Sequence, residues 1–311
     1  MKLFEVVVLC GAVSPEREVS IRSGHHVAKL LSRHYSVRLI ELDENRLPAG
    51  LNQETDLIFP LTHGDFGEDG CLQRLLDGAG FTYVGSGAES MELTIDKSRT
   101  KKVAQNCAIP VLPEIAFEGG KLENFSFADA CKRLGCSALF LKPRNKGSSI
   151  GCHRICGEDD WAKHVLPIAD GLWLLEPLCT GRDLTVGMLH GEPLAILEIV
   201  PRYEFFDYNS KYTPNGARHI CPAPIGETQT RAIGNYAREI FRACSCRDWC
   251  RIDFLLGNGG EAYFLEVNTI PGFTGGSLYP ESALGASIAT NEVLCKIITP
   301  ALYRLSTQNE H

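Results

Sequence analysis

The chain has 311 residues and a formal net charge of −7, with 44% hydrophobic and 22% charged residues. These values are typical of a soluble globular protein of roughly two or three domains. The net charge is negative and the chain has no excess of basic residues, so neither nucleic acid nor a membrane is expected as a partner. No apolar run approaches the ~18 residues of a transmembrane helix.

The first ten residues, MKLFEVVVLC, superficially resemble an export signal. Glu5 interrupts the run, which is too short and is followed by a charged segment, so we expect a cytoplasmic protein. In that compartment the 13 cysteines are expected to be reduced thiols that pack as small hydrophobic groups. The densest group, Cys244, Cys246 and Cys250, lacks the paired knuckles of a zinc site.

The first part of the chain, residues 1–91, alternates strand and helix patterns. The expected elements are a strand at 5–10, a helix from about 16 to 33, strands at 35–42 and 55–62, and a helix within 67–80, before TYVGS at 82–86. We interpret this order as a βαβαβ unit, which implies a parallel sheet flanked by helices.

A second unit is expected at 92–181 and a third at 182–311. In the second, Asp96 is a good N-cap for a helix that ends near Cys107. It is followed by a strand at 138–143, a glycine-serine loop, a returning strand, a helix at about 158–169 and a strand at 172–178. The third unit has strands at 183–190 and 192–200, a polar segment at 201–219, a helix at about 226–243, a hairpin at 251–268 and a C-terminal helix at about 281–305.

The hairpin carries a polar face. The sequence GNGG between two alternating runs is a strong turn signal. Arg251 and Asp253 share a face of the first strand, as Glu266 and Asn268 do on the second, because side chains alternate. Asp253 is expected roughly opposite Glu266. Two carboxylates and an amide oxygen suit Mg²⁺ or Mn²⁺ carrying phosphates, although a solvated hairpin face is the alternative.

Three glycine-rich loops follow predicted strands. KPRNKGSSIG, residues 142–151, has backbone N–H groups suited to phosphates, but it is not a P-loop. Lys97 and Lys142 are either phosphate ligands or surface lysines. GAVSPEREVS (11–20) and HGDFGEDG (63–70) lie at the carboxyl ends of parallel strands, where open α/β sheets bind ligands.

Seven motifs together resemble the D-alanine–D-alanine ligases of the ATP-grasp superfamily, in the family's order and over nearly the whole chain. They are SPEREVSIRSG, HGDFGEDG, GSGAESMELTIDKSRTK, KPRNKGSSIG, FDYNSKY, RIDF and EVNTIPGFTGGSLYP. The resemblance implies a mixed α/β (α+β) fold of three domains, an ATP-grasp with an N-terminal parallel-sheet, Rossmann-like domain. It also implies ATP as substrate, a homodimer, and ligation of two D-alanine molecules through an acyl phosphate for peptidoglycan.

The resemblance assigns a metal set and a nucleotide set. Two Mg²⁺ or Mn²⁺ ions would be held by Asp253, Glu266 and Asn268. Phosphates would meet Lys97 and Lys142, and the loop 144–151 would be a lid. Adenine would meet Glu176, and ribose Asp183. The full nucleotide set is Lys97, Lys142, Gly147, Ser148, Ser149, Glu176, Asp183 and Lys211.

The amino-acid side is assigned in the same way. Glu16 would hold the ammonium of the first D-alanine, near His63, for which a packed strand-end histidine is the alternative. Ser277 and the Leu278 backbone would hold the carboxylate of the second. Arg251 and the Gly272 N–H would form an oxyanion hole. Tyr212 would bond Ser148 and Glu16 on closure, which in this superfamily goes with D-alanine as acceptor.

Two departures from the family pattern are Ala12 in place of a second glycine and Pro177 after Glu176, and neither falls on a catalytic position. Two alternatives remain at this stage. One is a ligase of the same family with D-serine or D-lactate as acceptor, or with a role in secondary metabolism. The other is a catalytically inactive binding protein, against which the intact Arg251, Asp253, Glu266 and Asn268 argue.

Overall fold

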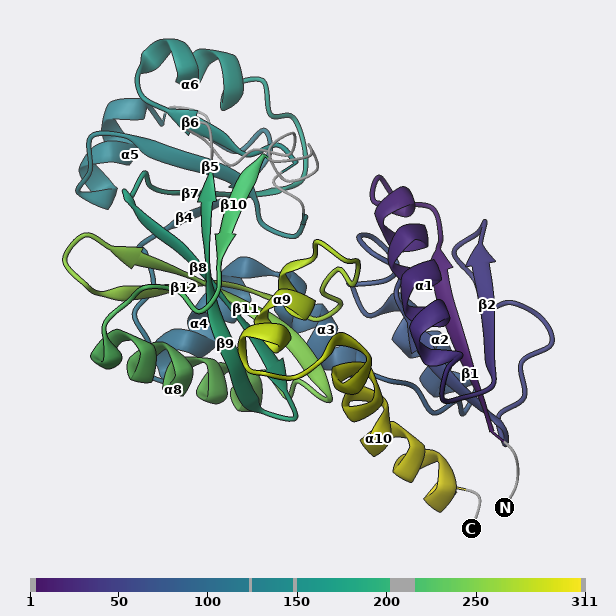
Figure 1. Ribbon diagram of the computed structural model, residues 1–311. Coiled ribbons are helices and arrows are strands. Elements are labelled where there is room, and N and C mark those ends of the chain that lie inside the picture. The colour runs from purple at the N-terminus through teal and green to yellow at the C-terminus, as the bar shows by residue number, and fades with distance from the viewer. Residues whose placement is uncertain (1–3, 123–124, 148–149, 202–215, 309–311) are drawn as a thin grey trace.

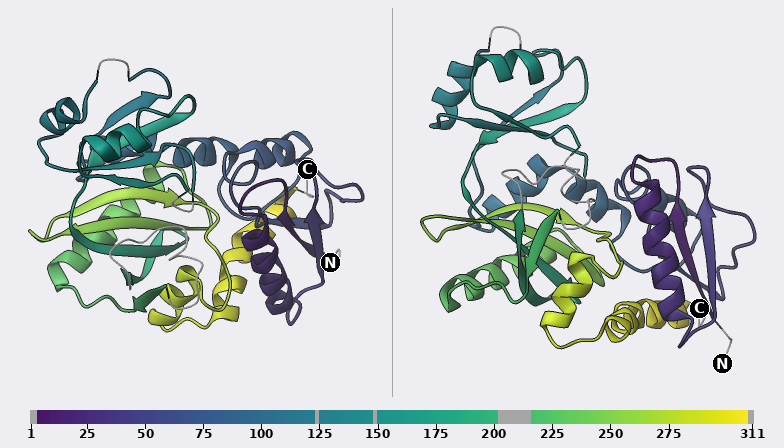
Figure 2. Two further views of the ribbon diagram at one scale, coloured as in Figure 1. Left: turned by 90° about the horizontal axis from the view of Figure 1, so that it is seen from above. Right: turned by 45° about the horizontal axis from the view of Figure 1, so that its top comes forward.

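The computed structural model describes residues 4–122, 125–147, 150–201 and 216–308 (Figure 1). The described residues form three sheets, and two further views show how these are arranged (Figure 2). The mixed α/β architecture that the sequence predicts is confirmed. No helix in the described ranges is long and apolar enough to cross a membrane. None of the cysteines in the described residues forms a disulfide, and those at 244, 246 and 250 are buried.

The N-terminal sheet is parallel with strand order β2–β1–β3: β2 (Val37–Leu42), β1 (Glu5–Gly11) and β3 (Asp56–Pro60). Helices α1 (Arg17–Leu31) and α2 (Cys71–Gly78) flank it. The expected βαβαβ order is wrong in one place, because β2 connects to β3 without a helix. That connection contains Pro48 and Gly50 and has no helical apolar period. TYVGS contributes only a bridge, between Tyr83 and Ile58.

Helix α3 (Ala88–Ile95) spans the expected boundary at residue 92 between the first and second units, and α4 (Lys97–Asn106) follows it. The predicted N-cap is confirmed, since the Asp96 carboxylate accepts a hydrogen bond from the Arg99 N–H at 3.1 Å. An antiparallel sheet follows, in the order β4 (Ile115–Glu118), β7 (Leu172–Pro177), β5 (Leu139–Pro143), β6 (His153–Ile155). Helices α5 (Phe127–Leu134) and α6 (Glu158–His164) pack on it around the buried Trp161. Helix α3, strand β4 and helix α5 were not predicted.

The third unit is a five-stranded antiparallel sheet in the order β10 (Ala217–Ile220), β9 (Glu192–Pro201), β8 (Gly181–Leu189), β11 (Trp249–Gly257), β12 (Ala262–Asn268). Its helices are α8 (Glu227–Ala243), α9 (Leu278–Gly285) and α10 (Thr290–Gln308). The expectation of one C-terminal helix is wrong: α9 ends before Ser287, whose φ of +61° is left-handed. That conformation stops a helix.

The first and third units share one hydrophobic core. Val27 of α1 and Phe59 of β3 belong to the same buried cluster as Val293 and Ile297 of α10. A buried Asp248 reinforces this contact by accepting hydrogen bonds from the Gly85 N–H at 2.8 Å and from Arg304 at 2.7 and 2.9 Å. The sheet that carries β11 and β12 is therefore held in a fixed relation to the loops that follow β1 and β3.

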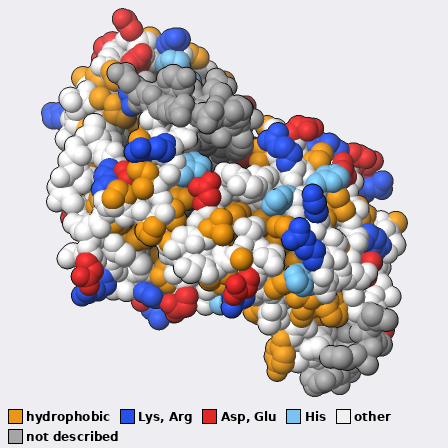
Figure 3. Space-filling model, viewed as in Figure 1, with side chains coloured by type: hydrophobic (Ala, Val, Ile, Leu, Met, Phe, Trp, Pro, Cys, Tyr) orange, Lys and Arg blue, Asp and Glu red, His pale blue; other side chains and the backbone are white. Residues whose placement is uncertain are grey.

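Charges are distributed without a dominant sign on the face shown in Figure 3, where basic and acidic side chains are interspersed. This distribution agrees with the absence of a basic footprint in the composition.

Candidate active site

A cavity of about 270 Å³ lies where the three units meet. Most of the described residues that the sequence assigned to chemistry line it: Glu16, His63, Lys97, Gly147, Arg251, Asp253, Glu266, Asn268, Gly272, Ser277 and Leu278. They come from loops after β1 and β3, from α4, from the β11–β12 hairpin and from the loop before α9. Segments far apart in the sequence thus converge on one concave site, as expected of a catalytic centre.

The hairpin register matches the prediction. Asp253 lies directly opposite Glu266, and Arg251 opposite Asn268. The sheet irregularity falls just after Asp253. All four residues line the cavity, which argues against the solvated-face alternative.

Asp253 is tightly held within the sheet. It accepts hydrogen bonds from Arg251 Nε and Nη2, both at 3.0 Å, and from the Thr185 hydroxyl on β8 at 2.6 Å. Burial by itself would lower the pKa of Arg251, but Asp253 and then Glu266 raise it above its usual value. The guanidinium therefore stays charged at any working pH and is available to stabilise a developing oxyanion.

The residues fit a hard divalent cation. The Asn268 Oδ1 atom is buried and, among the described residues, has no hydrogen-bond partner. It lies beside the paired carboxylates Asp253 and Glu266, and all three donors are oxygens, the ligands that Mg²⁺ and Mn²⁺ prefer. Lys97 Nζ lies 3.0 Å from Glu266. No group of three His, Cys, Asp or Glu side chains suited to a metal occurs in the described ranges, and one of the three candidate donors here is an amide oxygen.

A buried cluster of charged side chains joins α4, β5 and β7. Glu176 forms ion pairs with Lys142 Nζ at 2.6 Å and with Lys101, which also lies 2.9 Å from Glu114. The side chains of Glu176 and Lys142 are 3% and 9% exposed. Burial alone would raise the pKa of Glu176, but the two ammonium groups lower it below its usual value.

Lys101 was missed by the sequence reasoning. It follows Lys97 by four residues and therefore shares its helix face, which was the available signal. Burial by itself would lower the pKa of Lys142, but Glu176 and, after it, Glu266 raise it above its usual value. Lys142, Glu176 and Asp183 do not line the cavity itself.

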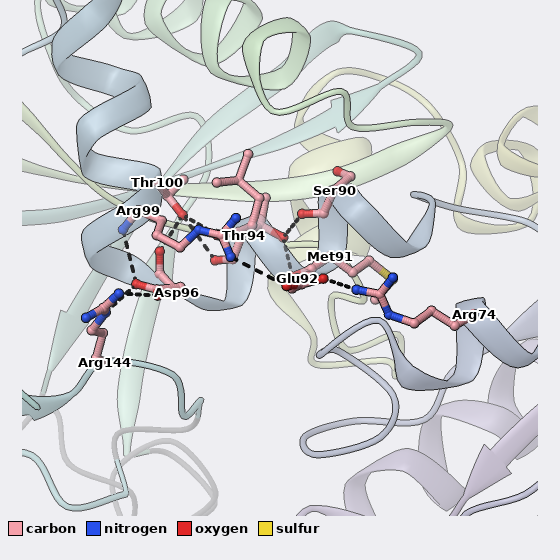
Figure 4. A network of polar contacts seen from close by, with 10 residues as sticks. Arg74, Ser90, Met91, Glu92, Thr94, Asp96, Arg99, Thr100 and Arg144 are labelled. Carbon is pink, nitrogen blue, oxygen red and sulfur yellow. Dashed lines mark hydrogen bonds and ion pairs between the residues drawn. The ribbon is translucent and has the colours of Figure 1, made fainter. Parts of the chain in front are cut away.

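The base of the glycine-serine loop is anchored to α4. Arg144 Nε donates to the Asp96 carboxylate at 2.6 Å, and the Lys97 N–H donates to the Arg144 carbonyl at 3.0 Å. Figure 4 shows this pair and a second chain of contacts in which Glu92 meets both Arg74 and Arg99. The start of the loop is therefore fixed next to Lys97.

The opposite wall is formed by Glu16 and by the loop after β3. Gly64 has a φ of +76°, and a Cβ there would lie 2.8 Å from Glu16 Oε2, so the site requires glycine. His63 Nε2 is 3.4 Å from the Ser23 hydroxyl, and its Nδ1 is 3.9 Å from Glu68. Its role and its packed-histidine alternative both remain predictions.

The last wall is the start of α9. Ser277 is the N-cap of this helix, but its side chain makes no cap hydrogen bond. Its hydroxyl instead accepts from the Thr274 N–H at 2.9 Å and lies 2.8 Å from the Thr274 hydroxyl. The first turn of α9 therefore has no side-chain cap from Ser277, an arrangement that suits an anion at the helix start.

Four assigned residues, Ser148, Ser149, Lys211 and Tyr212, lie outside the described residues. Their roles as lid, phosphate and closure residues stay predictions.

Family models match two parts of the chain. One described as D-ala D-ala ligase N-terminus matches residues 45–86, and one described as D-ala D-ala ligase C-terminus matches residues 103–299. A D-alanine–D-alanine ligase from Carboxydothermus hydrogenoformans is 35% identical over 303 residues, covering 94% of this chain and 97% of that protein.

Solved structures are similar over the full length. The D-alanine–D-alanine ligase of Bacillus anthracis complexed with ATP has a TM-score of 0.84 at 26% identity, covering 98% of this chain and 99% of that one. The VanG D-Ala:D-Ser ligase of Enterococcus faecalis has a TM-score of 0.81 at 26% identity, covering 96% and 100%.

Proposed function

This chain belongs to the D-alanine–D-alanine ligase family, and we propose that it joins two D-alanine molecules with ATP, giving D-alanyl-D-alanine for peptidoglycan precursors, ADP and phosphate. The observation that carries this proposal is that the hairpin residues Arg251, Asp253, Glu266 and Asn268 line the same cavity as Glu16. An inactive binding protein has no need of Arg251, Asp253, Glu266 and Asn268 in one register.

In the first step, a carboxylate oxygen of one D-alanine attacks the γ-phosphorus of ATP, and ADP leaves. Lys97 and Lys142 neutralise phosphate charge, which is the main contribution a protein makes to phosphoryl transfer. Two magnesium or manganese ions held by Asp253, Glu266 and Asn268 would add further positive charge when bound. Lys97 Nζ lies 3.0 Å from Glu266, so the lysine and the metal ions would stabilise the same phosphate charge.

In the second step, the amine of the other D-alanine attacks the acyl phosphate carbonyl, and phosphate leaves. The Arg251 guanidinium and the Gly272 N–H stabilise the oxyanion of the tetrahedral intermediate. A Cβ at Gly272 would lie 3.4 Å from the Ser277 hydroxyl, so a bare backbone keeps this corner open.

The two amino acids are held at opposite walls of the cavity. Glu16, with His63 nearby, pairs with the ammonium of the donor. Ser277 and the Leu278 N–H hold the carboxylate of the acceptor at the start of α9. The lid 144–151, with Gly147, Ser148 and Ser149, closes over the phosphates, and Tyr212 bonds Ser148 and Glu16 on closure. That closure excludes water from the acyl phosphate.

The nucleotide lies between the second and third units. Glu176 would lie against adenine while its carboxylate holds Lys142 in place for the phosphates, Asp183 would bind the ribose, and Lys211 would approach from the 201–219 segment. We further propose that residues 1–91, 92–181 and 182–311 are the three domains, and that the protein is a cytoplasmic homodimer.

The test is incubation with Mg-ATP and D-alanine alone, with D-serine, or with D-lactate, followed by phosphate release and product mass. We expect D-alanyl-D-alanine as the main product, and no phosphate above background with L-alanine as control. No phosphate with any pair would exclude the ligase. Product only with D-lactate would exclude D-alanine as acceptor. A D-serine product is the second candidate, which the similarity to the VanG ligase supports.

A further inference from the structure

A histidine–glutamate pair joins the catalytic cavity to α9. His219 on β10 lines the cavity beside Ile199, its neighbour on β9. Its Nδ1 lies 2.8 Å from Glu281 Oε2, and the two side chains are only 25% and 28% exposed. The family resemblance assigns neither residue a role.

Glu281 stands where its charge opposes substrate binding. It lies in the first turn of α9, with its N–H 3.3 Å from the Ser277 carbonyl. The start of a helix favours anions, but a carboxylate within the same turn partly satisfies that end and repels a second one. A substrate carboxylate bound at Ser277 and Leu278 would meet this repulsion.

His219 compensates this charge. Its imidazole lies 2.8 Å from the Glu281 carboxylate, close enough to hydrogen-bond to it and to draw its charge away from the helix end, which is then free to attract an anion. Of the neighbouring described groups, Ile199 on β9 is apolar, and Arg218 points to the other side of the sheet because side chains alternate.

Contacts made by Cys221 hold the strand that carries His219 close to the helix that carries Glu281. The Cys221 thiol donates to the Glu281 carbonyl at 3.5 Å, and a Cβ on Gly285 would lie 2.3 Å from Cys221 Sγ. The residue that follows β10 therefore packs closely against helix α9, two positions after His219.

We propose that His219 and Glu281 form a charge-compensated pair that keeps the start of α9 able to bind the carboxylate of the acceptor amino acid. His219 is in this account a positioning residue that acts on acceptor affinity through Glu281. The inference rests on the proposed function and assigns a determinant of its second substrate.

The test is a double-mutant cycle of His219→Gln, Glu281→Gln and both together, assayed at about pH 6.5, where histidines ordinarily titrate. Initial rates over a wide range of D-alanine give separate KM values for donor and acceptor. We expect His219→Gln to raise the acceptor KM about five- to tenfold, with the donor and ATP KM and kcat within about twofold. Glu281→Gln leaves the acceptor KM at or below the wild-type value, and the double variant returns to it.

A different result is expected if the pair only holds strand β10 against helix α9. In that case both single variants raise the acceptor KM and the double variant has a KM at least as high, which would overturn the inference. Equal changes in the donor KM, or no change in any variant, would also overturn it. His190→Gln is the matched control, because His190 bonds the Lys296 carbonyl outside the cavity and should change nothing. Wild-type protein that forms no dipeptide refutes the proposed function itself.

Discussion

Replacing Glu266 with glutamine is expected to abolish turnover, a loss of about a thousandfold or more, while the fold survives. The amide has the shape of the carboxylate but lacks its charge, so the metal set loses one of its two anionic ligands. Lys97 also loses its partner at 3.0 Å. The measurement is phosphate release under saturating Mg-ATP and D-alanine, together with Mn²⁺ binding, which should weaken in parallel.

Glu261→Gln is the matched control, because Glu261 belongs to the same hairpin but bonds the exposed Tyr263 hydroxyl at 2.7 Å. Its turnover should equal that of the wild type, and both variants should keep the wild-type circular dichroism spectrum. Full activity in Glu266→Gln would refute the metal role of the hairpin.

The second large effect is on stability, and it concerns Glu176. Glutamine at this position leaves the buried Lys142 and Lys101 without their shared carboxylate. Removing one partner of a buried ion cluster costs about 3–5 kcal/mol of unfolding free energy. The measurement is urea unfolding of both proteins at neutral pH.

The contribution of this cluster to the unfolding free energy is expected to depend on pH. The pKa of Glu176 is lowered in the folded protein, so its contribution to stability is present above its unfolded pKa, about 4.3, and is lost as pH falls through the folded value. The pKa of Lys142 is raised, so its contribution is present below about 10.4 and is lost as pH rises through the folded value. The difference between variant and wild type should therefore be largest between these limits and should shrink in acid.

The exposed pair of Glu227 and Arg231 on α8 is the control for Glu176. These side chains are 85% and 72% exposed, so Glu227→Gln should leave the unfolding midpoint unchanged. A Glu176 variant as stable as this control would contradict the account of the buried cluster.

Local patterns predicted the parts of the site that depend on local geometry. Alternation along two short strands placed Asp253 opposite Glu266, and a single carboxylate at Asp96 marked the start of α4. The break between α9 and α10 was not predicted, because Ser287 adopts a left-handed backbone conformation that is not expected for serine. Strand β4 has only four residues, too few for a period to show.

Contacts between residues far apart in the chain could not be predicted from local sequence patterns. The cluster of Lys101, Lys142 and Glu176 joins residues on α4, β5 and β7, which only the packed fold brings together. The core that the first unit shares with α10 could not be predicted either, because an apolar helix face does not show which other element packs against it. The pair of His219 and Glu281 was likewise invisible in sequence, 62 residues apart.

The D-alanine carboxylate is the proposed nucleophile toward ATP, and oxygen transfer tests this directly. D-alanine labelled with ¹⁸O in its carboxylate is turned over with unlabelled Mg-ATP, and the released phosphate is analysed by mass spectrometry. We predict that each phosphate carries one labelled oxygen, because the bond formed in the first step is between that oxygen and phosphorus. Unlabelled phosphate released together with dipeptide would contradict the acyl phosphate route.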